Sequence, residues 1–175
     1  MGKSVMRHDF SKVPSAEIPR SSFDRSCGLK TTFDAGYLVP IFVDEALPGD
    51  TLNLDMTAFG RLATPIHPFM DNMFLDTFYF AVPIRLIWDN WEKFNGAQDN
   101  PSDSTDYLVP TATESAAEAS LSDYLGIPTG VSLTRSNLWH RAYNLIWNEW
   151  FRDQNLQDSV TVDTDDGPDR DWETR

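Results

Sequence analysis

The chain has 175 residues, of which 41% are hydrophobic and 13% aromatic, enough for a folded domain with a core. Its net charge of −13 argues against nucleic-acid binding by the whole surface, because a polyanion would be repelled. The charge is unevenly spread: residues 1–40 carry six Lys or Arg against four acids, whereas residues 99–129 carry six acids and no base. Any contact with a polyanion is therefore expected near the N-terminus.

Cys27 is the single cysteine, which excludes an internal disulfide and fits a reducing compartment. The sequence has neither an apolar leader at its N-terminus nor an apolar run near the ~20 residues that span a bilayer. We therefore expect a soluble protein, made inside a cell, with no membrane partner.

Residues 1–30 alternate basic residues with Pro14, Pro19 and a few apolar anchors, a pattern typical of an extended arm. Two interpretations stay open for this arm. It is either a surface tail or a segment that ties neighbouring subunits together. Its basic residues considered for binding are Lys3, Arg7, Lys12, Arg20 and Arg25.

Three segments in the first half predict strands. Residues 37–43 are apolar but interrupted by Pro40, which fits an edge strand or a strand with a break. Residues 51–58 alternate apolar and polar side chains, which predicts a strand with one wet face. Residues 74–82 are apolar on both faces and predict a central, buried strand.

Helical spacing begins after Pro83, and residues 84–94 predict a helix that covers the central strand. Residues 95–113 read as a loop, residues 114–125 as a helix stopped by Gly126, and residues 138–150 as a strong helix capped by Thr134 or Ser136. The apolar arc of this last helix is wide, so we expect it to be buried on more than one side.

The tail from Ser159 starts like a strand and then becomes polar and acidic. The run Asp163, Asp165 and Asp166 with Gly167 fails as a calcium loop, because the first positions would lack carboxylates, and it predicts a solvated turn. With three or four good strands, the sheet edges are expected to lie open unless more chain or another subunit covers them.

No residue pattern predicts a catalytic, cofactor-binding or metal site. His8, His67 and His140 share no ligand spacing, and Cys27 lacks a convincing histidine partner. Asp71 and Asp76 could form a hydrolytic pair, although ordinary hydrogen-bonded carboxylates explain them better. Five tryptophans lie in predicted helices, where core or subunit-interface packing is the usual role: Trp88, Trp91, Trp139, Trp147 and Trp150.

Three long runs resemble a known family. They are SSFDRSCGLKTTFDAGYLVPIFVDEALPGDT, TAFGRLATPIHPFMDNMFLDTFYFAVPIRLIWDNWEKF and RAYNLIWNEWFRDQNLQ. Together they are similar to the N-terminal part of the major capsid protein of the Microviridae, small icosahedral single-stranded DNA phages, and of the gokushovirus branch in particular. The similarity extends over residues 6 to about 162, and two departures from it are Cys27 and the ending DRDWETR.

The resemblance implies a mainly β fold, a partial viral jelly roll (an antiparallel β-sandwich) with inserted α-helices and long loops. The expected organisation is an extended arm over residues 1–30, the N-terminal part of a jelly-roll domain over residues 31–162, and a polar tail over residues 163–175. Because family members are longer, the resemblance also implies a truncated chain.

By the same resemblance, the function is structural rather than enzymatic. The chain would be a major capsid subunit that binds copies of itself, other virion proteins and packaged single-stranded DNA, assembled in the bacterial host cytoplasm and located in the virion. The basic arm is then expected on the inner surface, near DNA or an internal protein. The alternative is a carbohydrate-binding β-sandwich module, since a fold does not determine a function.

Overall fold

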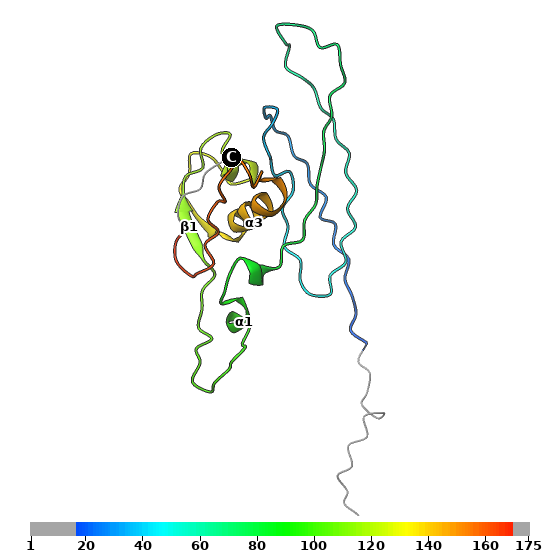
Figure 1. Ribbon diagram of the computed structural model, residues 1–175. Coiled ribbons are helices and arrows are strands. Elements are labelled where there is room, and N and C mark those ends of the chain that lie inside the picture. Colours follow the sequence, from blue (N-terminus) through cyan, green and yellow to red (C-terminus); the bar gives the residue numbers. More distant parts are fainter. Residues whose placement is uncertain (1–16, 170–175) are drawn as a thin grey trace, which may run out of the picture. The chain divides into compact units, whose positions relative to one another are not determined.

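The computed structural model describes residues 17–169 (Figure 1). The chain divides into two units, Met1–Lys30 and Thr31–Arg175. Residues 17–30, the described part of the first unit, are exposed and contain no helix or strand. Across residues 17–169, no helix is long and apolar enough to cross a membrane. The helices and strands assigned among the described residues all lie in the second unit.

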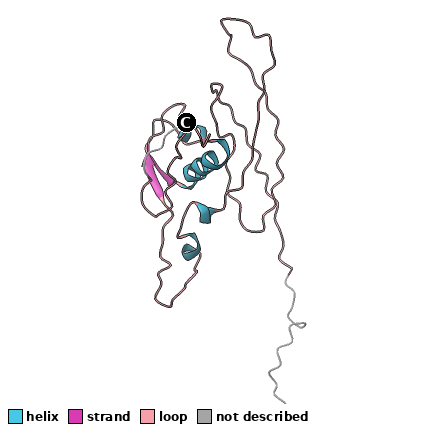
Figure 2. Ribbon diagram, in the orientation of Figure 1, coloured by secondary structure: helices cyan, strands magenta, loops and turns pink. Residues whose placement is uncertain are grey.

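All helices and strands assigned in residues 17–169 fall after Pro83 (Figure 2). Most of that range is irregular or extended, with short helices and one small sheet. In chain order the elements are η2 (Ile84–Leu86), α1 (Trp91–Phe94), β1 (Thr111–Glu114), α2 (Leu121–Tyr124), β2 (Leu133–Ser136), α3 (Leu138–Ile146) and η3 (Trp147–Phe151).

The sheet has two antiparallel strands, β1 and β2, with Thr111 opposite Ser136 and Glu114 opposite Leu133. The hydroxyls of Thr113 and Thr134 are 2.7 Å apart across the pair. The residues of β1 were predicted to end a loop (residues 95–113) and to begin a helix (residues 114–125), and this prediction is wrong. The partner strand lies about twenty residues further on, so a pattern read within one segment could not reveal the pairing.

The predicted helix over residues 114–125 is wrong except for its last turn, α2. Its end is as predicted: Gly126 has φ +88°, its N–H bonds the Asp123 carbonyl at 2.9 Å, and the Ile127 N–H bonds the Ser122 carbonyl at 3.0 Å. This pair of bonds is the Schellman motif, in which glycine takes the left-handed conformation. At the start, the Ser120 hydroxyl accepts a bond from the Asp123 N–H.

The strong helix over residues 138–150 is confirmed as α3 and the π-helical turn η3. Its apolar arc packs in two directions, as expected. Leu138 joins the first core cluster, with Ile87 and Trp88, and Tyr143 joins the second, with Leu121 and Leu125. Helix α3 is thus shared by both clusters.

The predicted helix over residues 84–94 is broken into η2 and α1 around Asp89. The Asp89 N–H does not bond a carbonyl of its own helix. It bonds the carbonyl of Thr164 at 2.9 Å, so a contact with a distant segment interrupts the helical ladder.

The strands expected over residues 37–43, 51–58 and 74–82 are not formed, and no strand follows Ser159 within the described residues. Residues of the expected central strand are exposed: Phe74 by 85% and Phe78 by 59%. A strand requires a hydrogen-bonded neighbour, and these segments have no strand partner among residues 17–169. The mainly β architecture is therefore found only as a small two-stranded sheet, and a jelly roll is not observed.

Candidate functional site

A buried polar network joins four elements around His140 of α3, which has no exposed surface. The Ser122 hydroxyl lies 3.0 Å from His140 Nε2, and Arg135 Nη1 lies 3.0 Å from His140 Nδ1. Glu114 accepts short hydrogen bonds from the Ser122 hydroxyl and from Arg135, with which it also forms an ion pair. The network thereby ties β1, α2, β2 and α3 together.

Burial and the neighbouring Arg135 charge lower the pKa of His140 to about 4, although the Glu114 charge opposes this. For Glu114, burial raises the pKa of the carboxyl, but hydrogen bonds from Ser122 and Arg135 and the Arg135 charge outweigh burial and lower it. At neutral pH the network therefore holds a neutral imidazole beside an ionised Glu114–Arg135 pair.

Ser122 and His140 are adjacent, as in a nucleophilic triad, but their hydrogen bonds are not those of a triad. In a triad the acid binds the histidine and the serine faces substrate. Here Glu114 binds Ser122 itself, Arg135 lies at the other ring nitrogen of His140, and Ser122 is 5% exposed. The network fits a scaffold role.

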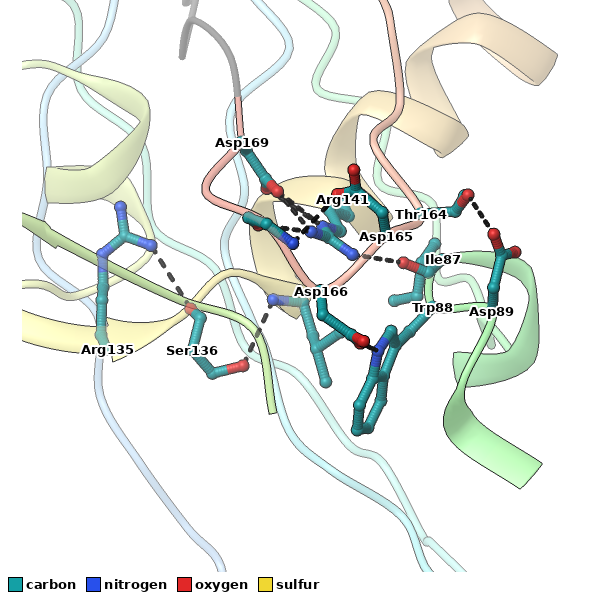
Figure 3. Close-up of polar contacts among 12 residues, drawn as sticks. Ile87, Trp88, Asp89, Arg135, Ser136, Arg141, Thr164, Asp165, Asp166 and Asp169 are labelled. Carbon is teal, nitrogen blue, oxygen red and sulfur yellow. Dashed lines mark hydrogen bonds and ion pairs between the residues drawn. The ribbon is translucent and has the colours of Figure 1, made fainter. Parts of the chain in front are cut away.

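A second polar centre lies around Arg141, whose side chain is 1% exposed (Figure 3). Arg141 Nη1 donates to the Ile87 carbonyl at 3.0 Å, and Nε donates to the two Asp169 carboxylate oxygens at 2.9 and 3.1 Å. Asp169 is 4% exposed in this ion pair. Removing either partner would leave a buried charge without compensation.

The segment Ser159–Asp169, here called the strap, is fixed to the helical elements at further points (Figure 3). Trp88 Nε1 donates to the Asp166 carboxylate at 2.5 Å, and the Thr164 hydroxyl donates to Asp89 at 2.8 Å. The Asn148 side chain makes two bonds, of 2.7 and 2.9 Å, with the Val160 backbone. The predicted acidic turn is thus found with Asp165 and Asp166 exposed, but the prediction missed that the Asp166 carboxylate and the Thr164 backbone also bond Trp88 and Asp89.

The sequence did not identify these two centres as sites. One signal was available: His140 and Arg141 are polar residues on the predicted helix over residues 138–150, whose wide apolar arc was expected to be buried. Their partners Glu114, Ser122 and Asp169 lie far away in sequence, and no local pattern links them.

The five tryptophans differ in exposure. Trp88 and Trp147 are buried, and Trp91 and Trp139 are half-buried. Trp150 is 71% exposed and lies in an aromatic group with Phe78, Phe80 and Phe151, in which the Phe80 and Trp150 ring centroids are 5.5 Å apart. Trp150 is thus the tryptophan of this set that is available to a partner.

The basic arm is only partly described. Arg20 and Arg25 are exposed, whereas Lys3, Arg7 and Lys12 lie outside the described residues, as does His8. Cys27 is an exposed free thiol. Asp71 and Asp76 are exposed, and residues 17–169 hold no cluster of three or more metal-ligating side chains.

Comparison with known proteins gives a consistent result. The profile of a family described as "Capsid protein (F protein)" matches residues 11–175. Capsid protein VP1 of Bdellovibrio phage phiMH2K is 55% identical over 173 residues, covering 97% of this chain and 32% of that protein. Capsid protein VP1 of Chlamydia phage 1 is 52% identical (93% and 29% covered), and that of Spiroplasma virus 4 is 36% identical (90% and 30% covered). The chain thus spans about a third of the length of these relatives.

Proposed function

Since the chain belongs to the capsid protein (F protein) family, we propose that it is a structural capsid subunit, not an enzyme, and that it associates with copies of itself and other virion proteins. The observation that carries the proposal is the family match over residues 11–175, supported by three relatives that are named capsid proteins. The shell would enclose a single-stranded DNA genome, so the protein would be located in the virion after assembly in the host cytoplasm.

The surface of the extended residues supports self-association. Large apolar side chains are rarely gathered in exposed positions on a monomer, and such patches mark interaction sites. Those exposed by more than half between residues 51 and 78 are Leu52, Leu54, Phe59, Ile66, Phe69, Met70, Met73, Phe74, Leu75 and Phe78. These residues have the composition of an interior, and further chain or further subunits would supply the cover.

On the same basis we propose that residues 51–58 and 74–82 become strands of a jelly roll once partner strands are present. Residues 51–58 alternate apolar and polar side chains, and residues 74–82 are apolar on both faces, and each pattern fits a strand of such a sandwich. The two strands formed among residues 17–169 carry TATE and LTRS, with no aromatic residue, so this small sheet offers no aromatic stacking platform for a carbohydrate.

Negative-stain microscopy tests the proposal. The 175-residue chain should be compared with a version extended by the remaining two-thirds of the phiMH2K relative. We expect closed shells from the extended form and concentration-dependent oligomers from the 175-residue chain in sedimentation velocity. Monomers at all concentrations, for both forms, would contradict the proposal.

For the basic arm we propose contact with packaged DNA or with an internal virion protein. Support comes from the excess of basic residues at the N-terminus and from the exposure of Arg20 and Arg25. Neutralising Lys3, Arg7, Lys12, Arg20 and Arg25 to Gln should weaken single-stranded DNA binding and reduce its salt slope by about 3 to 4. The control neutralises Arg61 and Arg85, exposed cations outside the arm. Equal binding by both variants would refute the arm's role.

For the aromatic group around Trp150 we propose a subunit contact, because aromatic side chains are enriched at interface centres. Trp150→Ala should weaken self-association by tenfold or more if Trp150 is an interface anchor. Trp91→Ala is the matched control, since Trp91 is half-buried and its ring packs against Trp88 and Phe94, away from this aromatic group. Solvent exposure of Trp150 in an assembled particle, measured by fluorescence quenching, would count against the contact.

A further inference from the structure

Helices α2 and α3 hold an extended segment of the chain, Thr32–Glu45, here called the docking segment. Tyr124 of α2 donates its hydroxyl to the Thr32 carbonyl at 3.0 Å, and Tyr143 of α3 donates its hydroxyl to the Leu38 carbonyl at 2.8 Å. A third bond joins Trp139 Nε1 to the Glu45 carboxylate. The segment is thus bound at its start, middle and end.

Apolar contacts accompany these bonds. Leu38 and Val43 of the docking segment pack against the cluster formed by Leu121, Leu125 and Tyr143. Burial raises the pKa of the Tyr143 hydroxyl to about 12, which keeps it a neutral donor. Two of the three acceptors are backbone carbonyls, so the face of α2 and α3 recognises an extended backbone with two apolar side chains.

The docking segment is buried on one side only. Phe33, Tyr37 and Phe42 remain exposed by 47%, 63% and 42%. The segment is followed by the exposed turn Leu47–Asp50, in which the Asp50 N–H bonds the Leu47 carbonyl at 3.0 Å and Gly49 has φ +86°. A short turn with a permissive glycine is a connection that can redirect the chain at low cost.

We propose that the docking segment is exchanged between copies of this chain, each copy placing its Thr32–Glu45 on the α2–α3 face of a neighbour. Every bond and apolar contact of the intramolecular arrangement can be reproduced between two copies, because the same residues meet. Exchange of an identical element is a low-cost route to association, and within an assembly the segments of neighbouring copies are concentrated enough to compete with the chain's own segment. The inference rests on the proposed function, since it requires copies that associate.

Two complementary variants test the exchange. The segment variant carries Leu38→Asp with Val43→Asp, which places charges against the apolar cluster. The face variant carries Tyr124→Phe with Tyr143→Phe, which removes two donors and keeps the ring packing. Each variant alone should self-associate about tenfold or more weakly than the unsubstituted chain in sedimentation velocity. A matched control is Tyr107→Phe, whose ring packs against the other cluster.

An equimolar mixture of the two variants separates the alternatives. With exchange, an intact segment meets an intact face once in each mixed pair, so the mixture should associate more strongly than either variant. With intramolecular docking, neither chain holds an intact pair, and the mixture should equal the average of the two variants. If the unsubstituted chain self-associates and the mixture associates only as strongly as the average of the two variants, the exchange is overturned. The proposed function then still stands.

A cross-linking experiment covers the case in which the segment variant fails to fold. In a Cys27→Ser background, one chain carries Val43→Cys and a differently tagged chain carries Trp139→Cys. A bismaleimide should join the two tags in a mixture if the segment is exchanged. Absence of the mixed product, while a single chain carrying both cysteines cross-links internally, would overturn the proposal. An unsubstituted chain that stays monomeric would contradict the proposed function, and the exchange with it.

Discussion

Two regions of the second unit differ in how they use their apolar residues. Residues 84–169 contain all assigned helices and strands, and every buried hydrophobic side chain among residues 17–169 lies between Ile87 and Trp147. Residues 31–82 are comparably rich in large apolar side chains, yet most of these are exposed. The difference teaches that apolar alternation alone does not produce a strand, because the backbone also needs a partner for its N–H and C=O groups.

The largest expected effect comes from truncating one aromatic side chain in each region. Trp88→Ala should lower the free energy of unfolding by about 4 kcal/mol, since Trp88 is fully buried in the first core cluster. Phe74→Ala removes a side chain that is 85% exposed and should change the free energy of unfolding by less than about 0.5 kcal/mol. Urea denaturation measures both. A similar loss of unfolding free energy in both variants would contradict this difference between the two regions.

The next largest loss of stability is expected from breaking the ion pair between Arg141 and Asp169 of the strap. Arg141→Met should destabilise the chain by about 3 kcal/mol, because Asp169 would keep a buried charge without a partner. The double variant Arg141→Met with Asp169→Leu should recover much of this loss, since an apolar pair can replace a buried ion pair. Arg85→Met, at an exposed cation, is the matched control. If the urea midpoint of the double variant is no higher than that of Arg141→Met, the broken ion pair is not the cause of the lost stability.

The pH dependence of stability is the third test. The pKa of His140 is about 4 in the folded chain and near 6.5 in the unfolded chain, so the unfolded chain binds the proton first as the pH falls. Stability should therefore decrease by about 3 kcal/mol between pH 6.5 and 4. The lowered pKa of the Glu114 carboxyl acts in the same direction, with its contribution lost as the pH falls below 4.5.

His140→Gln isolates the imidazole contribution, because glutamine keeps a polar group at this position and does not titrate. Its stability should change less between pH 6.5 and 5 than that of the unsubstituted chain, although its stability at pH 7 will be lower. An unchanged slope in this window would assign the pH dependence to other groups.

The smallest effect concerns two glycines, one in each region. Gly126→Ala should lower the free energy of unfolding by about 1 kcal/mol, because a backbone φ of +88° is strained for any residue with a Cβ. Gly60→Ala, in the extended region, meets no neighbouring atom and should be neutral or slightly stabilising. Thermal melting of both variants measures the difference, and equal shifts in melting temperature would contradict the role of the C-terminal cap of α2.

Sequence patterns predicted two local features correctly, although the strands expected over residues 37–43, 51–58 and 74–82 are not formed. The stop at Gly126 and the long helix with its doubly buried arc depend on residues within a few positions of one another, and both were found. The break near Asp89 and the pairing of β1 with β2 depend on residues about twenty or more positions away, and both were missed. The two buried polar centres were missed for the same reason.

The sequence by itself determined the resemblance to a capsid family, the basic N-terminus, the stop at Gly126, the amphipathic helix and the two-faced apolar segments, because composition and short-range spacing carry that information. Only the tertiary structure decided that Arg141 binds Asp169, that His140 meets Glu114 and Arg135 in one network, and that Phe74 and Phe78 stay exposed. Those outcomes depend on which distant groups can satisfy a buried charge or a backbone hydrogen bond, and such partners are chosen in space and not along the chain.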